Sequence, residues 1–471
     1  EILEEKSNAE TSETICPICS VTLEGVSLDE AERHVNGCLD GSSSTQLPTL
    51  STGTQKSHPR PLNSIRPLPS SSKIKLPDKT SDSQQIKLAV NVPFYKIMEG
   101  TTIAVDAFKY GKIPNITAYF LSHAHADHYT RLSHTWDHGF VYCSQTTANL
   151  ICHNLGVKKQ WVKPLKDNEP TMVDGVKVTV LDANHCPGSS LFLFEGVKPQ
   201  GKPFRYLHCG DFRASPAQLR HPALKDKKID ICYLDTTYLN PKYCFPAQEQ
   251  VINACSDLVK SRDESILVLI GTYTIGKERI VKQIAKSIGS KIYCDTRKSL
   301  IFKCIEDPEL HELMTDDPFK AQVHVTNLFA IKNEMLEEYL RRFRGHFTHI
   351  IGLRPTGWTY KPDALTSSAH PPLDRPITPV EVTQACLYPQ RDSTERCQAF
   401  GVPYSEHSSF FELTCFCVSM DWVKIIPTVN CGSPASRAKM KVWFERWQAE
   451  RKRRIEANLP LFIEPRSEAY W

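Results

Sequence analysis

One stretch of six residues constrains this chain more than any other. His123, His125, Asp127 and His128 begin one residue after an apolar run at 118–121, and only alanines separate them. Because alternate residues of an extended chain point to the same side, His123 and His125 can bind one metal ion, while Asp127 and His128 turn toward a second. A polar loop without a function would not need a buried strand before it. The stretch therefore predicts a hydrolase with two metal ions.

Four later segments repeat the pattern of an apolar strand that runs into a polar turn. The strands are expected at 176–181, 204–209, 229–234 and 400–404, and their turns carry His185, Asp211, Asp235 and His407. A single His or Asp after a strand is more often a capping residue than a metal ligand. Four such turns in one chain supply the ligands that the six-residue stretch lacks.

The N-terminal region has the spacing of a structural zinc site, with Cys16, Cys19, His34 and Cys38 as ligands. Such a set suits tetrahedral zinc if the second pair shares one face of a helix at 28–39. The unit is too short to bury a core, so the metal would supply its folding energy. The pattern is similar to the ubiquitin-binding zinc fingers of DNA-repair proteins, and a nucleic-acid contact is the alternative.

Composition points to an intracellular protein of two or three domains. The 471 residues are 40% hydrophobic, and the 17 cysteines form an odd number scattered through apolar strands without a secretory signal, which favours a reducing compartment. No stretch approaches the length and apolarity of a membrane span. The net charge of +4 permits an anionic partner without demanding one. The chain begins at Glu1, so we expect it to be a fragment.

Three further segments organise the chain. Residues 43–86 are rich in Ser, Thr and Pro and are expected to be a flexible linker. The Pro-rich stretch 360–398 predicts a long loop. The last helix is expected to begin with Ser433 as its N-cap and Pro434 in its first turn. It ends in the basic run 451–454, for which a solvated helix end, a DNA-backbone contact and a nuclear-import signal remain open.

Residues 239–398 have their own alternation of strands and helices, with a strand at 266–270, a helix at 276–288 and a strand at 291–293. This rhythm predicts a parallel sheet in a separate α/β lobe inserted before His407. The turn before the helix imitates a nucleotide-binding loop, but Glu278 stands where such a loop needs Ser or Thr. We therefore reject an ATPase, although the turn can still hold a phosphate.

Together these residues resemble the metallo-β-lactamase fold with a β-CASP insertion, and within it the DNA cross-link repair nucleases related to Artemis and Apollo. The first motif of that family matches the six-residue stretch, and the next two match His185 and Asp211. The β-CASP motifs match Asp235, His407 and Val429, and the segments 271–278 and 354–358 share the likeness. The match extends from about residue 92 to about 447, and it is closest to the cross-link repair 5′-exonucleases linked to nitrogen-mustard sensitivity.

The resemblance implies an α/β protein with an αββα metallo-β-lactamase sandwich, an inserted β-CASP α/β lobe and a small N-terminal zinc finger. It divides the chain into a finger at 11–42, a linker at 43–86, a first lactamase part at 87–238, the β-CASP lobe at 239–398, and a second lactamase part with a basic C-terminal helix at 399–471.

The resemblance also implies the roles of the site residues. One ion would be held by His123, His125, His185 and Asp211, and a second by Asp127, His128 and His407, with Asp211 bridging the two. Catalytic roles fall to Asp127, Asp211, Asp235 and His407, where Asp235 orients a ligand imidazole. Thr236, Lys277 and Ser405 are candidates for a pocket that receives a 5′-terminal phosphate. Zinc is expected at one or both positions, with magnesium or manganese as alternatives for the second.

By the same resemblance the protein is a monomeric 5′-to-3′ DNA exonuclease of interstrand cross-link repair in the nucleus. Its partners would be 5′-phosphorylated DNA and ubiquitin or a ubiquitinated repair protein, with no membrane. The RNA-processing branch has His where this chain has Val429, which favours DNA over an RNA endonuclease. A hairpin-opening endonuclease remains the nearest alternative. A small-molecule hydrolase of the lactamase type leaves the inserted lobe unexplained, and a catalytically dead ubiquitin-binding scaffold leaves seven metal ligands unexplained.

Overall fold

The computed structural model describes residue 34 and residues 92–198, 200–262, 265–360 and 382–471. Cys16, Cys19 and Cys38 of the expected finger lie outside these ranges, as do the linker at 43–86 and residues 361–381. His34 is described and its side chain is buried.

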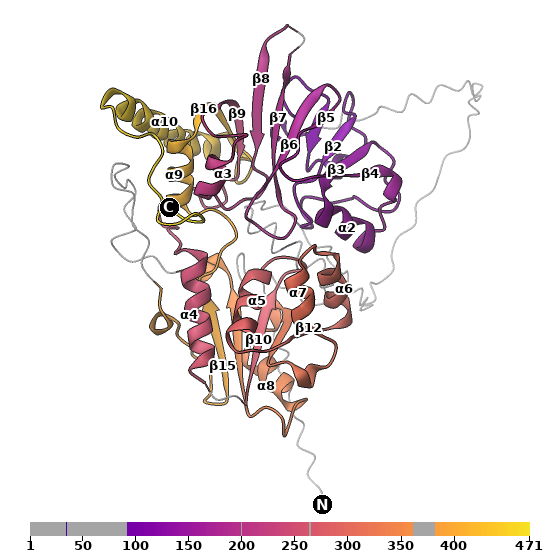
Figure 1. The fold of residues 1–471 in the computed structure, drawn as a ribbon, viewed down its shortest axis with the longest axis vertical. Helices are drawn as coiled ribbons and strands as arrows, with labels where there is room; N and C mark the ends of the chain where they lie inside the picture. The colour runs from indigo at the N-terminus through magenta and orange to yellow at the C-terminus, as the bar shows by residue number, and fades with distance from the viewer. Residues whose placement is uncertain (1–33, 35–91, 199, 263–264, 361–381) are drawn as a thin grey trace, which may run out of the picture.

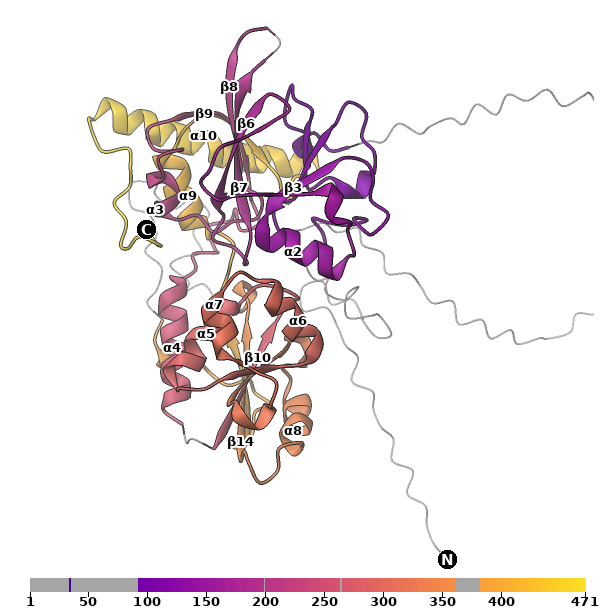
Figure 2. The same ribbon diagram turned by 45° about the vertical axis from the view of Figure 1, so that its right-hand side comes forward.

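The chain folds into two lobes stacked on each other (Figures 1 and 2). The upper one, here called the sandwich lobe, contains two sheets. The first has four parallel strands in the order β1-β2-β3-β4, namely Ile103–Val105, Ala118–Phe120, Phe140–Ser144 and Val162–Leu165. The second has the order β16-β9-β8-β7-β6-β5, where β5 to β9 are Thr171–Val173, Val176–Asp182, Ser190–Val197, Pro203–His208 and Lys228–Leu234, and β16 is Asp421–Pro427.

Alternating side chains of the strands hold the layers of the sandwich lobe together. In β7, Phe192 and Phe194 point between the two sheets, where each ring centroid lies 5.1 Å from that of Phe120. Leu191 and Leu193 point to the opposite face and join the core beneath the helices. This period of two is what a strand between two apolar layers requires.

Helices cover both outer faces of this sandwich. The four-stranded sheet packs against α2 (Gln145–Asn154), and the six-stranded sheet packs against α9 (Phe410–Ser419), α10 (Pro434–Glu456) and the short α3 (Pro216–Arg220). The resulting layers are helix, sheet, sheet and helix, as the resemblance implied.

The lower, inserted lobe is built on six parallel strands in the order β12-β11-β13-β10-β14-β15. Strands β10 to β15 are Ile266–Thr272, Ile292–Cys294, Met314–Thr315, Val323–Asn327, His349–Pro355 and Cys397–Val402. Helices α4 to α8 are Gln248–Lys260, Glu278–Ser287, Thr296–Cys304, Pro308–Leu313 and Asn333–Arg341. The predicted boundary at 398 falls inside β15, so the inserted sheet continues to Val402 before the chain returns to the sandwich lobe.

Strand β10 shows why a strand of the inserted sheet is apolar at consecutive positions of its sequence. Val268 and Ile270 join the core on the side of α4 and α5, whereas Leu267 and Leu269 join the core on the side of α8. A parallel strand with helices on both faces must be apolar at every position. The predicted helix that follows is α5, and it begins two residues later than expected, at Glu278.

The basic C-terminal helix α10 begins as predicted, because the Ser433 hydroxyl accepts a hydrogen bond from the Ser436 amide at 3.0 Å. Its basic run is largely occupied by partners in the same lobe. Arg451 donates to the Val418 carbonyl at 2.6 Å, and the Glu450 carboxylate accepts from its neighbours at positions 453 and 454. The Arg451 bond joins α10 to α9, and the bonds to Glu450 lie within α10 itself. Within the described ranges, no helix is both long and apolar enough to cross a membrane.

Candidate metal centre

The predicted ligands meet because four strands of the six-stranded sheet run in one direction. Strands β6, β8, β9 and β16 all end at the same edge of this sheet. His185 follows β6, Asp211 follows β8 and Asp235 follows β9, while the six-residue stretch follows β2 in the facing sheet. The sheets thus deliver side chains from distant parts of the sequence to one point.

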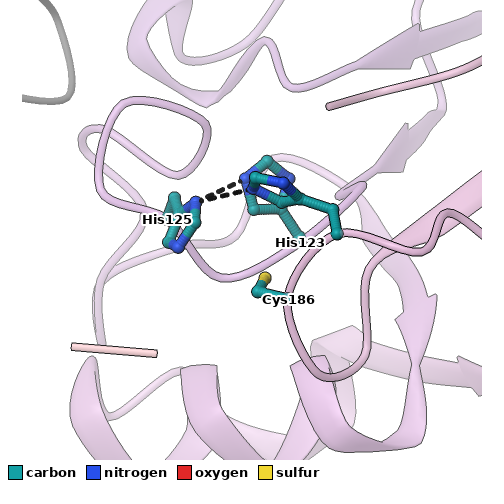
Figure 3. A group of neighbouring side chains, drawn as sticks. His123, His125 and Cys186 are labelled. Carbon is teal, nitrogen blue, oxygen red and sulfur yellow. Dashed lines mark hydrogen bonds between the residues drawn. The ribbon is translucent and has the colours of Figure 1, made fainter. Parts of the chain in front are cut away.

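The ligand atoms form three overlapping groups in which every pair lies within 4.8 Å. The groups are His123, His125, His185 and Cys186; His123, His128 and Asp211; and His185, Asp211 and His407. In the first group, His123 Nε2 lies 2.9 Å from His125 Nδ1, and Figure 3 shows these two side chains with a nitrogen of each directed toward the other and Cys186 nearby. Such a spacing of nitrogens and carboxylate oxygens suits ligands that share metal ions.

Each of the five imidazoles has one ring nitrogen bound to a partner outside the cluster. The pairs are His123 Nδ1 with Ser122 Oγ (2.9 Å), His125 Nε2 with the Ile275 carbonyl (3.0 Å), His128 Nδ1 with Asp106 Oδ2 (2.8 Å), His185 Nδ1 with the Glu406 carbonyl (2.9 Å) and His407 Nδ1 with Asp235 Oδ2 (2.9 Å). A metal-binding His almost always uses its second nitrogen in this way, because the outer bond fixes the ring and its tautomer. The donor set therefore fits a metal cofactor.

The carboxylates lie where a second ion would need them. His128 Nε2 is 3.2 Å from Asp127 Oδ2 and 3.3 Å from Asp211 Oδ2, and the same Asp211 oxygen is 3.7 Å from His123 Nε2. Asp211 thus reaches both sets of histidines. His407, which we expected beside Asp127 and His128, lies in one group with His185 and the shared Asp211.

Electrostatics separates the histidines into two kinds. Burial, together with the neighbouring imidazoles, lowers the pKa of His123 and His185 well below the usual value. Burial acts in the same direction on His128, but the carboxylates around it outweigh burial and raise its pKa well above the usual value. His123 and His185 are therefore neutral near pH 7, which is the form that binds a metal ion.

Asp106 is a site residue that the sequence reasoning missed. It is buried, accepts from the Ser122 amide at 2.8 Å and pairs with His128. Burial alone would raise its pKa, but the charge and hydrogen bond of His128 outweigh burial and lower the pKa to about 2. The missed signal was available, because Asp106 follows strand β1 just as the other acids follow theirs.

Replacing Asp106 with asparagine should weaken metal binding without changing any ligand. The outer carboxylate of a metal-bound His is worth about 10- to 100-fold in metal affinity. We expect a loss of that size for Asp106→Asn in competition with a chromophoric chelator. Asp174→Asn, at an exposed turn, serves as the control. Unchanged affinity in the Asp106 variant would show that this carboxylate does not support His128.

Cys186 was not predicted as a ligand, although its sulfur lies in the first group. Without a metal ion, burial together with the nearby Glu406 and Glu278 carboxylates raises the pKa of the thiol well above the usual value. Three imidazoles and Asp211 already supply the four ligands of a tetrahedral ion, so we leave Cys186 out of the ligand set.

Lys277 has an unpredicted partner in Glu406. The Lys277 ammonium lies 2.9 Å from Glu406 Oε2, the Lys277 amide donates to Oε1 at 2.8 Å, and both side chains are buried. Burial raises the pKa of Glu406, but the charge and hydrogen bonds of Lys277 outweigh burial and lower it. A β-carbon on Gly276 would lie 2.8 Å from Glu406 Oε2, so only glycine permits this approach.

The three expected phosphate-binding residues have different surroundings. Ser405 and Lys277 line a pocket together with His125, Asp127, His185, Asp211 and His407. Thr236 is not among the residues that line it, because its hydroxyl donates to the Val429 carbonyl at 2.6 Å. The charge of Lys277 is already neutralised by Glu406, so it is not the free cation that we expected for a phosphate.

The rejection of an ATPase agrees with the geometry of the same turn. Glu278 stands where a nucleotide-binding loop has its magnesium-binding hydroxyl, and its Oε1 accepts from the Gly276 amide at 2.9 Å. The carboxylate thus occupies a backbone donor that such a loop would offer to phosphate.

Comparisons with known proteins agree with this architecture. Residues 103–268 match the family described as "Beta-lactamase superfamily domain", and residues 308–433 match "DNA repair metallo-beta-lactamase". The chain is 44% identical to the DNA cross-link repair protein pso2/snm1 of Schizosaccharomyces pombe, over 96% of this chain and 81% of that protein. It is 37% identical to the DNA cross-link repair protein SNM1 of Arabidopsis thaliana, over 75% of this chain and 69% of the relative.

A third relative is the 5′ exonuclease Apollo of Gallus gallus, which is 32% identical over 71% of this chain and 63% of that protein. The identity to the pso2/snm1 protein of S. pombe extends over nearly the whole chain. The chain therefore belongs to the Pso2/Snm1 family of DNA cross-link repair proteins, with a metallo-β-lactamase fold and a β-CASP lobe.

Proposed function

We propose that this protein is a metal-dependent DNA nuclease that degrades strands from 5′-phosphorylated ends during the repair of interstrand cross-links. One observation is the main support for a metal-dependent reaction. Five imidazoles, each fixed by an outer hydrogen bond, gather their second nitrogens near one another and near two buried or half-buried aspartates. Such a cluster has no packing function that apolar residues would not perform better. Family membership supports a nuclease of cross-link repair.

In this proposal one ion would be held by His123, His125, His185 and Asp211. A second would be held by Asp127, His128 and Asp211, and His407, which shares a group with Asp211, would complete the set. Two such cations would lower the pKa of a water molecule and offset charge on the attacking and leaving oxygens of a phosphodiester. The protein residues fix the ligand rings, and Asp235 positions His407 through the 2.9 Å hydrogen bond.

Zinc is the ion we assign to the imidazole-rich position, because neutral imidazoles and one carboxylate are its usual catalytic ligands. The position between Asp127 and Asp211 is richer in carboxylate oxygens, which also suit magnesium or manganese. We therefore propose zinc in the first position and zinc, magnesium or manganese in the second.

Two similarities to known proteins support DNA cleavage from a 5′ end: one concerns the end that is cut, and the other concerns DNA rather than RNA. The relative from G. gallus is itself named a 5′ exonuclease. Val429 stands where RNA-processing β-CASP enzymes have His, and its carbonyl is fixed by Thr236 beside Asp235. The pocket over the metal ligands is lined by both lobes, as a site that clamps a strand end would be.

The direct test is digestion of end-labelled single-stranded DNA with a 5′ phosphate or a 5′ hydroxyl. We expect mononucleotides to be released from the phosphorylated 5′ end, with a preference of about one to two decades in rate over the hydroxyl. Nitrocefin should not be hydrolysed. Equal digestion of both ends together with cutting of DNA hairpins would favour the hairpin-opening endonuclease, and rapid nitrocefin hydrolysis would favour a small-molecule hydrolase.

The N-terminal finger should be dispensable for this chemistry. We propose that Cys16, Cys19, His34 and Cys38 hold a structural zinc, and that the finger binds ubiquitin or a ubiquitinated repair protein in the nucleus. The described fold begins at residue 92 and contains every ligand of the metal centre. A monomeric chain shortened to start at residue 85 is therefore expected to keep full nuclease activity and to lose ubiquitin binding in a pull-down. Loss of cleavage on simple oligonucleotides would place the finger in the active site instead.

A further inference from the structure

Arg354 is a half-buried cation without a counter-ion among the described residues. Its Nε is buried and has no hydrogen-bond partner, and its guanidinium forms no ion pair with any described carboxylate. Burial lowers its pKa from the usual value. A guanidinium that is partly withdrawn from water and left unpaired costs free energy, so such groups are generally found where an anion binds.

The register of the inserted sheet places Arg354 at the edge that faces the metal centre. It lies near the carboxyl end of β14, where it is paired with Gly401 of β15, and the residue before it is paired with Ile270 near the end of β10. Ligands of parallel α/β sheets bind at the carboxyl ends of the strands. Thr356, two residues further along, lines the pocket that holds the metal ligands.

Tyr273 connects Arg354 to this pocket. It follows β10, the strand beside β14, and it lines the same pocket as Thr356. The same ring lies 5.8 Å from the Lys277 ammonium. Lys277 is neutralised by Glu406, and the Lys298 ammonium donates to the Tyr273 and Thr274 carbonyls. Arg354 lies just outside the lining of the pocket, and its guanidinium has no described counter-ion.

We propose that Arg354 binds a phosphate group of the DNA strand next to the linkage held over the metal ligands. Its planar guanidinium can donate two parallel hydrogen bonds to one phosphate, which a lysine cannot. The phosphate is either the 5′-terminal group or an internal phosphodiester, and both offer the same oxygens. This assignment rests on the proposed nuclease function and adds to it the residue that positions the strand.

The test is the binding of a fluorescent single-stranded oligonucleotide in the presence of chelator, followed by anisotropy over a range of KCl concentrations. We expect Arg354→Met to weaken binding on the order of tenfold. Each phosphate contact with single-stranded DNA contributes about 0.7 to the slope of log affinity against log salt, so the slope should fall by about that amount. Arg354→Lys keeps the charge and should keep most of the slope. Arg342→Gln, an exposed arginine of the same lobe, is the matched control.

Comparing a 5′-phosphorylated with a 5′-hydroxyl oligonucleotide shows which phosphate Arg354 binds. A loss confined to the 5′-phosphorylated oligonucleotide assigns Arg354 to the terminal group, and an equal loss with a 5′ hydroxyl assigns it to an internal linkage. Arg354→Gln repeats the measurement if the methionine variant does not fold. Unchanged affinity and slope in a folded variant, with normal binding by the unaltered protein, would overturn the assignment. Failure of the unaltered protein to bind or cleave DNA would instead overturn the proposed function.

Discussion

Nuclease activity is expected to be lost when Asp211 is replaced by asparagine. The Asp211 carboxylate reaches both His123 and His128, so its loss removes a ligand and a negative charge from both proposed ions. We expect the rate of oligonucleotide digestion to fall at least about a thousandfold, which corresponds to about 4 kcal/mol of barrier.

The same variant should remain folded, because Asp211 belongs to none of the apolar cores. Circular dichroism and thermal melting check the fold, and metal analysis checks the loss of bound ions. Asp257→Asn, on an exposed position of α4, is the control and should keep normal activity. Near-normal turnover by the Asp211 variant would contradict the shared carboxylate.

Stability is expected to fall sharply when Lys277 is replaced by methionine. The ammonium and the Glu406 carboxylate are both buried and 2.9 Å apart, so the substitution leaves an uncompensated charge in the interior. Breaking a buried pair by removing one partner costs about 3–5 kcal/mol. Denaturant unfolding should show a loss of free energy of this size.

The double variant Lys277→Met with Glu406→Gln provides the control for this effect. Because it removes both charges, it should regain most of the lost stability, and the cycle of variants gives the coupling between the two side chains. A loss below about 1 kcal/mol in the single variant would show that water or another group already compensates Glu406.

The metal centre and the Lys277–Glu406 pair also show which parts of the structure the sequence can predict. The strands and the polar turns after them were predictable, because an apolar run that ends in His or Asp is a local pattern. Asp106 carries that same pattern and could have been found. The layers of the sandwich lobe followed from the resemblance, and the alternation along β7 shows the packing that holds them together.

The interactions between the lobes could not be predicted in this way. Glu406 is separated from Lys277 by 129 residues, and the Ile275 carbonyl is separated from His125 by 150. No local pattern indicates which side chain a distant turn will meet. The sequence therefore predicted Lys277 as a phosphate ligand. In the fold, Lys277 is paired with Glu406, whereas Arg354 has no counter-ion among the described residues.

The most direct test of the central claim is a metal titration of the metal-depleted protein, followed by the release of mononucleotides from a 5′-phosphorylated oligonucleotide. If two ions share the ligands of the metal centre, activity should be absent in chelator and should rise as zinc, manganese or magnesium is added. It should reach its plateau at about two ions per metal centre. Zinc bound by the N-terminal finger is excluded from this count by repeating the titration with the chain that starts at residue 85. Full digestion of the oligonucleotide in chelator, with no metal bound to the sandwich lobe, would contradict the account.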